Sequence, residues 1–424
     1  MNARLRLCAL AVTLLLSAGT LSAAETKPPV ENLGALVETA LSNNPELAGS
    51  QARWQMFTNR AAQATAFEDP MLMLKVQNGI ITDPFNFSKD PMTQKVIGIS
   101  QQIPFFGKRA LKGEVAAREA EALHWTHEER KLELARMVKE NYYQIYFTDK
   151  ALAIVDKNIR IMDDFITLAQ TKYSVGQGMQ QDVFKSQVER SKMLDMRIGL
   201  EQQRASLVAA LNALLYRPAT TPVGTIPDFE LTPLALTAEE LRNRALERRP
   251  QIKGLQAQIE KATAGRKLAQ REFYPDFNVS LEYMQRQPSM NDEGLDMYSL
   301  GVTFNLPVQQ KRRHAMVAEA NSEINMATAE VNMFRNTVDA GIADLLAKLE
   351  KRRRLVELYK TGIIPQAEQS LESATIGYRV NKVDFLSLLD SRNTLFGYER
   401  EYYESMAEYQ MQLAQLEALV GGLK

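Results

Sequence analysis

The chain has 424 residues, with 51 Lys and Arg against 51 Asp and Glu, so its formal net charge is zero. That balance does not favour nucleic acid as a partner, because nucleic-acid-binding domains carry a clustered basic excess. The only cysteine is Cys8. Disulfides, thiolate metal sites and cysteine nucleophiles are therefore excluded from everything beyond it.

Residues 1–24 have the pattern of a secretory signal peptide. They carry Arg4 and Arg6, then an apolar run, then small residues ending in Ala23 and Ala24, after either of which we expect cleavage. The apolar run is too short for a spanning helix, which needs about 20 residues. Removal of this segment leaves 49 basic and 51 acidic residues, a formal charge of 49 − 51 = −2.

The first half of the remaining chain, residues 25–217, begins with two predicted strands at about 70–78 and 95–103. Apolar and polar side chains alternate there, and the intervening segment is rich in turn-forming residues. One face of the predicted sheet is apolar, and in the first strand it is formed by Leu72, Leu74 and Val76. Long helices are expected at about 108–172 and 180–216, because apolar residues recur in steps of three and four without an intervening proline.

A linker rich in Pro and Thr, residues 218–233, leads to a second half, residues 234–424. The second half shows the same order of elements. Strands are predicted at about 275–285 and 297–306, and long helices at about 312–377 and 384–420. The apolar residues that alternate with polar ones in these strands are Phe277, Val279, Leu281, Leu300, Val302 and Phe304.

The two halves are tandem copies of one unit. The segment around Pro45 recurs around Pro250, at an offset of 250 − 45 = 205. The same offset relates Pro70 to Pro275 and Tyr173 to Tyr378, while the strand ends Gly98–Pro104 and Gly301–Pro307 are related by 203. Matched prolines and glycines at a nearly constant period indicate a repeat rather than the general self-similarity of helical sequences.

The predicted fold is mainly α with a small β part: long coiled-coil helices and four strands per chain. No later segment has the composition of a spanning helix, so a membrane crossing here would use strands. Bacterial transmembrane barrels start at about eight strands. Four strands are too few, and two or more chains would have to share one barrel.

Two motifs resemble the TolC-like outer-membrane efflux family over residues 32–421. One is the strand exit from Gly98 through Pro104 to Gly107 and the adjoining Lys108 and Arg109, whose Pro-Phe-Phe-Gly-Lys form is most similar to the metal-cation and copper efflux branch. The other is the pair of matched helical turns after Tyr173 and Tyr378. Some members of the family carry a lipid-modified N-terminal cysteine, which this sequence does not offer.

The resemblance implies a homotrimer in which three sets of four strands close one transmembrane β-barrel, surrounded by outer-membrane lipid, and twelve helices form a tunnel across the periplasm. It also implies a periplasmic membrane-fusion adaptor and an inner-membrane export pump as partners, with no cofactor. The two turns would lie at the periplasmic tip and contact the adaptor, through Gly176, Gly178, Asn381 and Lys382.

The same comparison places a gate carboxylate at Asp390, with Asp182 and Asp384 as further members of an acidic constriction. Ser387 stands where a second gate aspartate is expected. The alternative is that these aspartates lie on solvated faces or favour helix starts, where a negative charge is stabilised.

Other chemistry has weaker support. His124 and His127 are three residues apart on a predicted helix, but no third ligand is fixed by spacing. The pairs Met71 with Met73 and Met193 with Met196 suit soft metals or ordinary packing. We expect no metal site and no catalytic residue. A periplasmic helical scaffold or adaptor without a channel remains the alternative to an export duct.

Overall fold

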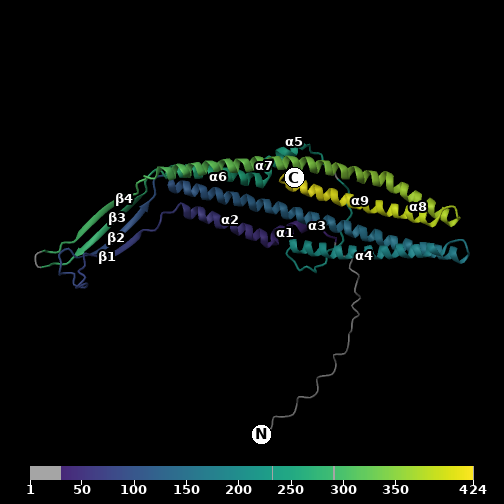
Figure 1. Cartoon of the computed structure of the whole chain (residues 1–424), viewed down its shortest axis with the longest axis horizontal. Coiled ribbons are helices and arrows are strands. Elements are labelled where there is room, and N and C mark those ends of the chain that lie inside the picture. Colours follow the sequence, from purple (N-terminus) through teal and green to yellow (C-terminus); the bar gives the residue numbers. More distant parts are fainter. Residues whose placement is uncertain (1–29, 232, 290–291, 424) are drawn as a thin grey trace, which may run out of the picture.

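The computed structural model describes residues 30–231, 233–289 and 292–423, so the predicted signal segment 1–24 lies outside the described residues. The molecule is elongated, with a sheet at one end and a long helical body that ends in two turns at the other (Figure 1). None of the described helices has an apolar stretch long enough to cross a membrane.

The sheet contains four antiparallel strands in the order β1-β2-β3-β4: β1 Met71–Gln77, β2 Gln94–Ile103, β3 Phe277–Arg286 and β4 Met297–Phe304. The central ladder joins the two halves of the chain, because β2 belongs to the first copy and β3 to the second. Ile99 pairs with Leu281 and Ile103 with Phe277. Both copies therefore contribute to one continuous sheet.

Helices of the first copy are α1 Leu33–Asn43, α2 Pro45–Ala64, α3 Lys108–Ser174 and α4 Gln180–Leu214. With 67 residues, α3 extends for about 100 Å at 1.5 Å per residue. It begins directly after Gly107, whose φ of 86° is a left-handed conformation that favours glycine. That turn redirects the chain from strand to helix.

Helices of the second copy are α5 Ala238–Arg248, α6 Pro250–Arg271, α7 Gln310–Leu358, α8 Ile364–Arg379 and α9 Phe385–Leu419. The helix expected over 312–377 is interrupted. A π-helical segment, η1 Tyr359–Ile363, separates α7 from α8. Pro365 lies in the first turn of α8, and because proline has no N–H and clashes with the carbonyl four residues earlier, the regular ladder cannot pass through it.

The described residues of the segment 218–233 pack against the helical body. Val223 and Ile226 are buried in the cluster that α1, α3 and α4 share. The Tyr146 hydroxyl donates to the Asp228 carboxylate at 3.0 Å, and the backbone N–H of Glu31 donates to the Thr225 carbonyl. The connection between the copies therefore adds to the core.

A buried ion pair joins the second copy to the first. Glu129 on α3 is only 7% exposed and accepts from Arg249 at 3.0 Å and from the Gln251 backbone N–H at 3.0 Å. Arg249 also donates to the Leu419 carbonyl at the end of α9. Three helices of the body, α3, α6 and α9, therefore meet at this ion pair.

We predict that Glu129→Ala lowers the stability of the helical body by about 3 to 5 kcal/mol, because it leaves the Arg249 guanidinium, whose side chain is only 14% exposed, without its counter-charge. Glu133→Ala, one turn further along α3, removes a half-exposed ion pair with Arg130 and should cost less than about 1 kcal/mol. The measurement is the thermal midpoint of helical circular dichroism for the two variants. Equal midpoints would contradict the role given to Glu129.

Candidate functional site: the helical tip and the sheet face

Both turns at the end of the helical body have the same backbone geometry. In the first, Gly176 has a φ of 73°, its N–H donates to the Tyr173 carbonyl, and Gln177 donates to the Lys172 carbonyl. In the second, Asn381 has a φ of 62° and the same two bonds recur four residues before α9, from Asn381 and Lys382. These are Schellman caps, and asparagine replaces glycine because it also tolerates the left-handed conformation.

Of the four residues predicted for partner contact, Gly176, Asn381 and Lys382 are exposed at the turns and Gly178 is partly covered. A Cβ atom at Gly178 would lie 2.9 Å from the Lys172 Cβ. Glycine is thus needed there for close packing of the turn against α3. The exposed neighbour Gln177 is a better position for a probe.

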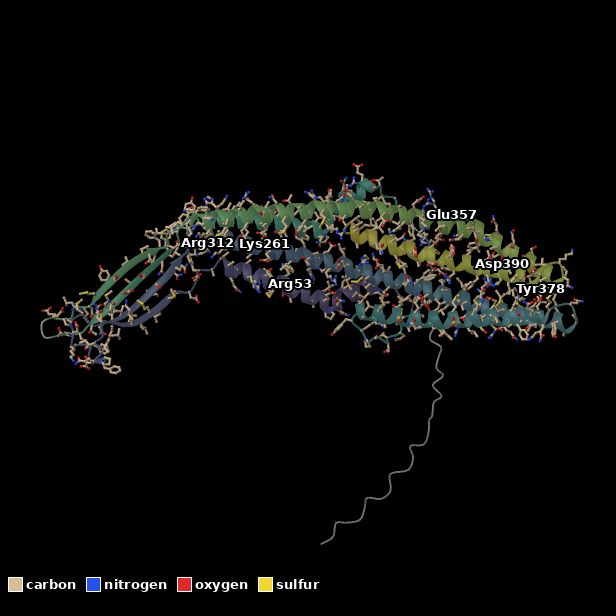
Figure 2. The ribbon with its side chains drawn as sticks, viewed as in Figure 1. Arg53, Lys261, Arg312, Glu357, Tyr378 and Asp390 are labelled. Carbon is tan, nitrogen blue, oxygen red and sulfur yellow. The ribbon has the colours of Figure 1, made fainter. Side chains whose placement is uncertain are left out.

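Four residues connect the two turns. The Lys172 ammonium donates to the Asn381 side chain and lies 4.7 Å from the centre of the Tyr378 ring. The Tyr378 hydroxyl donates to the Asp182 carboxylate at 3.3 Å. The first hairpin, α3 with α4, is therefore bonded to the second, α8 with α9, at its very end (Figure 2).

Burial is the main cause that raises the pKa of Tyr378 to about 12, and the Asp182 charge adds to it. The Tyr378 hydroxyl therefore stays protonated and donates its hydrogen bond to Asp182 throughout the physiological pH range. Sequence reasoning did not identify Lys172 or Tyr378 as partners. Tyr378 matches Tyr173 in the repeat, but Tyr173 is 48% exposed and Tyr378 only 4%, so equivalent positions have different roles.

The three predicted gate aspartates have three different environments. Asp384 caps α9 by accepting from the Ser387 backbone N–H at 2.7 Å, which lowers the pKa of its carboxyl group. Asp182 is bonded to Tyr378. Asp390 is exposed on α9 and forms no ion pair with any described residue. Asp384 therefore serves as a helix cap, as the alternative interpretation expected. Among the three aspartates, Asp390 is the one without an ion pair, a cap bond or a tyrosine bond to a described residue (Figure 2).

At the other end of the molecule, all nine predicted strand residues lie on one face of the sheet, because residues directly paired across a ladder share a face. The rows are Leu72 with Ile99, Leu281 and Leu300; Val279 with Val302; and Phe277 with Phe304, while Leu74 and Val76 pair with Ile97 and Lys95. Leu72, Leu74 and Leu300 are about 70% exposed. Phe277 and Val279 are half-buried.

The opposite face is mostly polar and holds Met71 and Met73 opposite Ser100 and Gly98. Lys75 on this face pairs with Glu282 at 3.5 Å. The other methionine pair lies in the helical body, where Met193 is buried and Met196 packs beside it. The described methionines of both pairs thus occupy sheet or packing positions.

His124 and His127, three residues apart on α3, have separate partners. The His127 ring bonds to the Ser50 hydroxyl at 2.6 Å, and His124 lies against the rings of Trp54 and Trp125. Within the described ranges, no three His, Cys, Asp or Glu side chains come together as a metal site would require.

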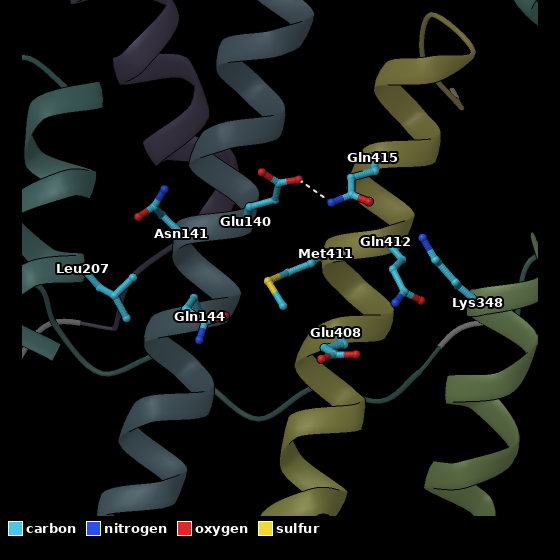
Figure 3. Close-up of a pocket in the computed structure, with 9 residues that line it drawn as sticks. All are labelled: Glu140, Asn141, Gln144, Leu207, Lys348, Glu408, Met411, Gln412 and Gln415. Carbon is cyan, nitrogen blue, oxygen red and sulfur yellow. Dashed lines mark hydrogen bonds between the residues drawn. The ribbon is translucent and has the colours of Figure 1, made fainter. Parts of the chain in front are cut away.

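A hollow at mid-length of the body is lined by α3, α4, α7 and α9, mostly with polar side chains (Figure 3). Glu140 accepts from Arg136 and from Gln415, each at 2.8 Å. Glu408 is paired with Arg352. Both carboxylates are thus paired with arginines of the helical body.

Comparison with known proteins agrees with this arrangement. Residues 36–215 and 241–422 each match the family model of outer membrane efflux proteins. The cobalt-zinc-cadmium resistance protein CzcC of Cupriavidus metallidurans is 24% identical over 293 residues, which are 68% of each chain. The outer membrane efflux protein BepC of Brucella suis is 24% identical over 388 residues, 85% of this chain and 79% of BepC.

Solved structures share the fold. The outer membrane protein VceC of Vibrio cholerae superposes with a TM-score of 0.78 at 20% identity, covering 92% of this chain and 97% of VceC. CusC superposes with a TM-score of 0.77 at 16% identity, covering 97% and 96%. Because the family model matches once in each repeat and spans most of the sequence, the chain belongs to the outer membrane efflux protein family.

Proposed function

We propose that this outer-membrane efflux channel is built from three copies of the chain, whose sheets close one twelve-stranded barrel and whose helices form a tunnel into the periplasm. The observation that supports it most is the sheet: the nine apolar residues predicted to contact lipid share one face, and the edge strands β1 and β4 each have one unpaired side. A periplasmic scaffold would leave that apolar face in water, at a cost that soluble proteins avoid.

The channel is proposed to be passive, coupled through a periplasmic adaptor to an inner-membrane export pump. Exposed turns held on a rigid body are common contact sites, and both turns here project at the end of the helices (Figure 1). Metal cations are the proposed cargo, because CzcC is a cobalt-zinc-cadmium resistance protein. The hollow lined by polar side chains of α3 and α9 is consistent with a tunnel wall that contacts water.

We further propose that Asp390 is the principal charge of an acidic constriction at the tip, with Asp182 and Asp384 secondary. Three-fold repetition of an exposed carboxylate around a narrow axis would favour cations and bind multivalent ones. The bonds from Lys172 to Asn381 and from Tyr378 to Asp182 would hold the hairpins together at rest.

Lipid contact is tested by Leu300→Arg against Ser299→Arg, which lie next to each other on β4 and point to opposite faces. An arginine near the bilayer midplane costs about 2 to 4 kcal/mol on the lipid face. Ser299 pairs with Glu282, so an arginine there gains a partner. We expect trimer assembly, read from a heat-modifiable band in outer-membrane fractions, to fail only for Leu300→Arg; equal assembly would refute the lipid-facing assignment.

Adaptor contact is tested by Gln177→Cys and Lys382→Cys, at exposed positions of the two turns. Each should crosslink to the periplasmic adaptor in intact cells. Ser322→Cys, on an exposed face of α7 far from the tip, is the matched control. The tip assignment is wrong if crosslinking is as strong at position 322 as at the turns.

The acidic constriction is tested in planar bilayers with Asp390→Asn, Asp182→Asn and Asp384→Asn. Asparagine keeps the helix cap at 384 and an acceptor for Tyr378 at 182, so the variants remove charge with little effect on the fold. Loss of Asp390 should reduce cation selectivity and block by trivalent cations most strongly. An unchanged triple variant would rule out an acidic constriction at these positions.

A further inference from the structure

Lysines and arginines gather where the helices meet the sheet. Both long helices that start there begin with basic residues: Lys108, Arg109 and Lys112 on α3, and Lys311, Arg312 and Arg313 on α7. Lys267 and Arg271 end α6 at the same place. Figure 2 shows Arg312 at this junction.

Contacts among these segments bring the cations to one location. Lys108 donates to the Tyr274 carbonyl at 3.1 Å, just beyond the end of α6. Arg313 donates to the Glu272 carbonyl at 2.5 Å. The end of α6 thus contacts the starts of both α3 and α7, and a Cβ built on Gly107 would lie 3.9 Å from the Arg271 guanidinium.

Most of these charges are not neutralised within the chain. Lys108, which is buried, pairs with Glu272 at 3.3 Å and Asp276 at 3.0 Å. Arg313 donates to the Glu272 and Gln309 backbone carbonyls and, like the six remaining cations, forms no ion pair with any residue that the structure describes. We call these six the basic collar: Arg109, Lys112, Lys267, Arg271, Lys311 and Arg312. Together with Lys108 and Arg313 the collar makes eight cations, and the carboxylates of this region are Glu68, Asp69, Glu114, Glu272, Asp276 and Glu319. This leaves an excess of 8 − 6 = 2 positive charges per chain.

The position of these cations opposes the helix dipole. Lys311 and Arg312 lie in the first turn of α7, and Arg109 in the first turn of α3, where neither helix has an acidic residue. The positive end of the dipole disfavours a cation there. A fixed anion outside the chain would reverse this cost, because N–H groups and cations would then face it together.

Apolar side chains lie beside the collar. Phe106, Leu306 and Val308 are 78%, 68% and 76% exposed, and each lies just beyond a strand whose apolar face we assign to lipid. Phe105 stacks on Tyr274 with ring centres 4.5 Å apart. A band of apolar and aromatic groups followed by cations is the order of a membrane surface, where acyl chains give way to phosphates.

We propose that the basic collar binds the phosphate groups of anionic phospholipids in the membrane leaflet that faces the periplasm. Guanidinium groups match phosphate oxygens with two parallel hydrogen bonds, and the excess charge would be repeated three times around a trimer. An acidic protein surface would also attract the cations, but it would not account for the exposed apolar residues that continue from the sheet. This inference rests on the proposed placement of the strands in the outer membrane.

The test uses full-length protein reconstituted in phosphatidylcholine vesicles that contain spin-labelled phosphatidylglycerol or spin-labelled phosphatidylcholine. The motionally restricted fraction of each label gives its relative association with the protein. One cation at a membrane surface favours an anionic lipid roughly fivefold, and because only part of the boundary lipid contacts the collar, we expect an average preference of about twofold. Added salt should reduce it.

The variant is Lys311→Gln with Arg312→Gln, which relieves the unfavourable dipole contact and should fold at least as well. The control is Arg379→Gln with Lys382→Gln, two exposed cations at the opposite end. The preference should fall towards one in the variant and persist in the control. The proposed lipid binding by the collar is wrong if the wild-type protein shows no preference for phosphatidylglycerol, or if the variant keeps the wild-type preference. In either case, motionally restricted lipid would still support the membrane placement of the strands. No restricted lipid of either kind overturns both.

Discussion

The ladder between β2 and β3 is the interaction on which the rest of the molecule depends. It joins strands that are more than 170 residues apart, and it fixes which side chains share a face, since a slip of one residue would move every apolar side chain to the polar side. α3 and α7 both leave the sheet at the same end of its strands, because Ile103 and Phe304 each pair with Phe277. Two hairpins that start together and have similar lengths then end together, and the tip contacts follow from this.

The extent to which charged side chains are paired differs along the molecule. In the helical body, arginines and carboxylates neutralise one another, as in the buried contact of Arg249 with Glu129. At the tip, Lys172 and Asp182 are engaged through Tyr378. At the junction with the sheet, the six cations of the basic collar form no ion pair with any described residue. A protein with balanced overall charge thus presents local excesses at the places where it would meet a lipid surface or an ion.

Much of this could be predicted from the sequence. The period-two alternation in the strands identified the apolar face that includes Leu72 and Phe304, because the pleat of a strand alone determines which side chains lie on the same face of a sheet. The heptad pattern without proline anticipated α3. Pro365 was visible, but the π-helical segment before it was not anticipated, since periodicity does not reveal how a helix absorbs a missing N–H. The bond from Tyr378 to Asp182 depends on the packing of two hairpins 196 residues apart, which no local pattern specifies.

Closure of three sheets into one barrel can be tested by crosslinking the sheet edges. Because Cys8 is the only cysteine of the chain and lies in the predicted signal segment, cysteines introduced in pairs along β1 and β4 report only on contact between those strands. If three sheets form one barrel, some pairings should join β4 of one chain to β1 of the next, and the crosslinked products should stop at three chains. Absence of any crosslink between chains, or a series that stops at two or continues beyond three, would contradict it.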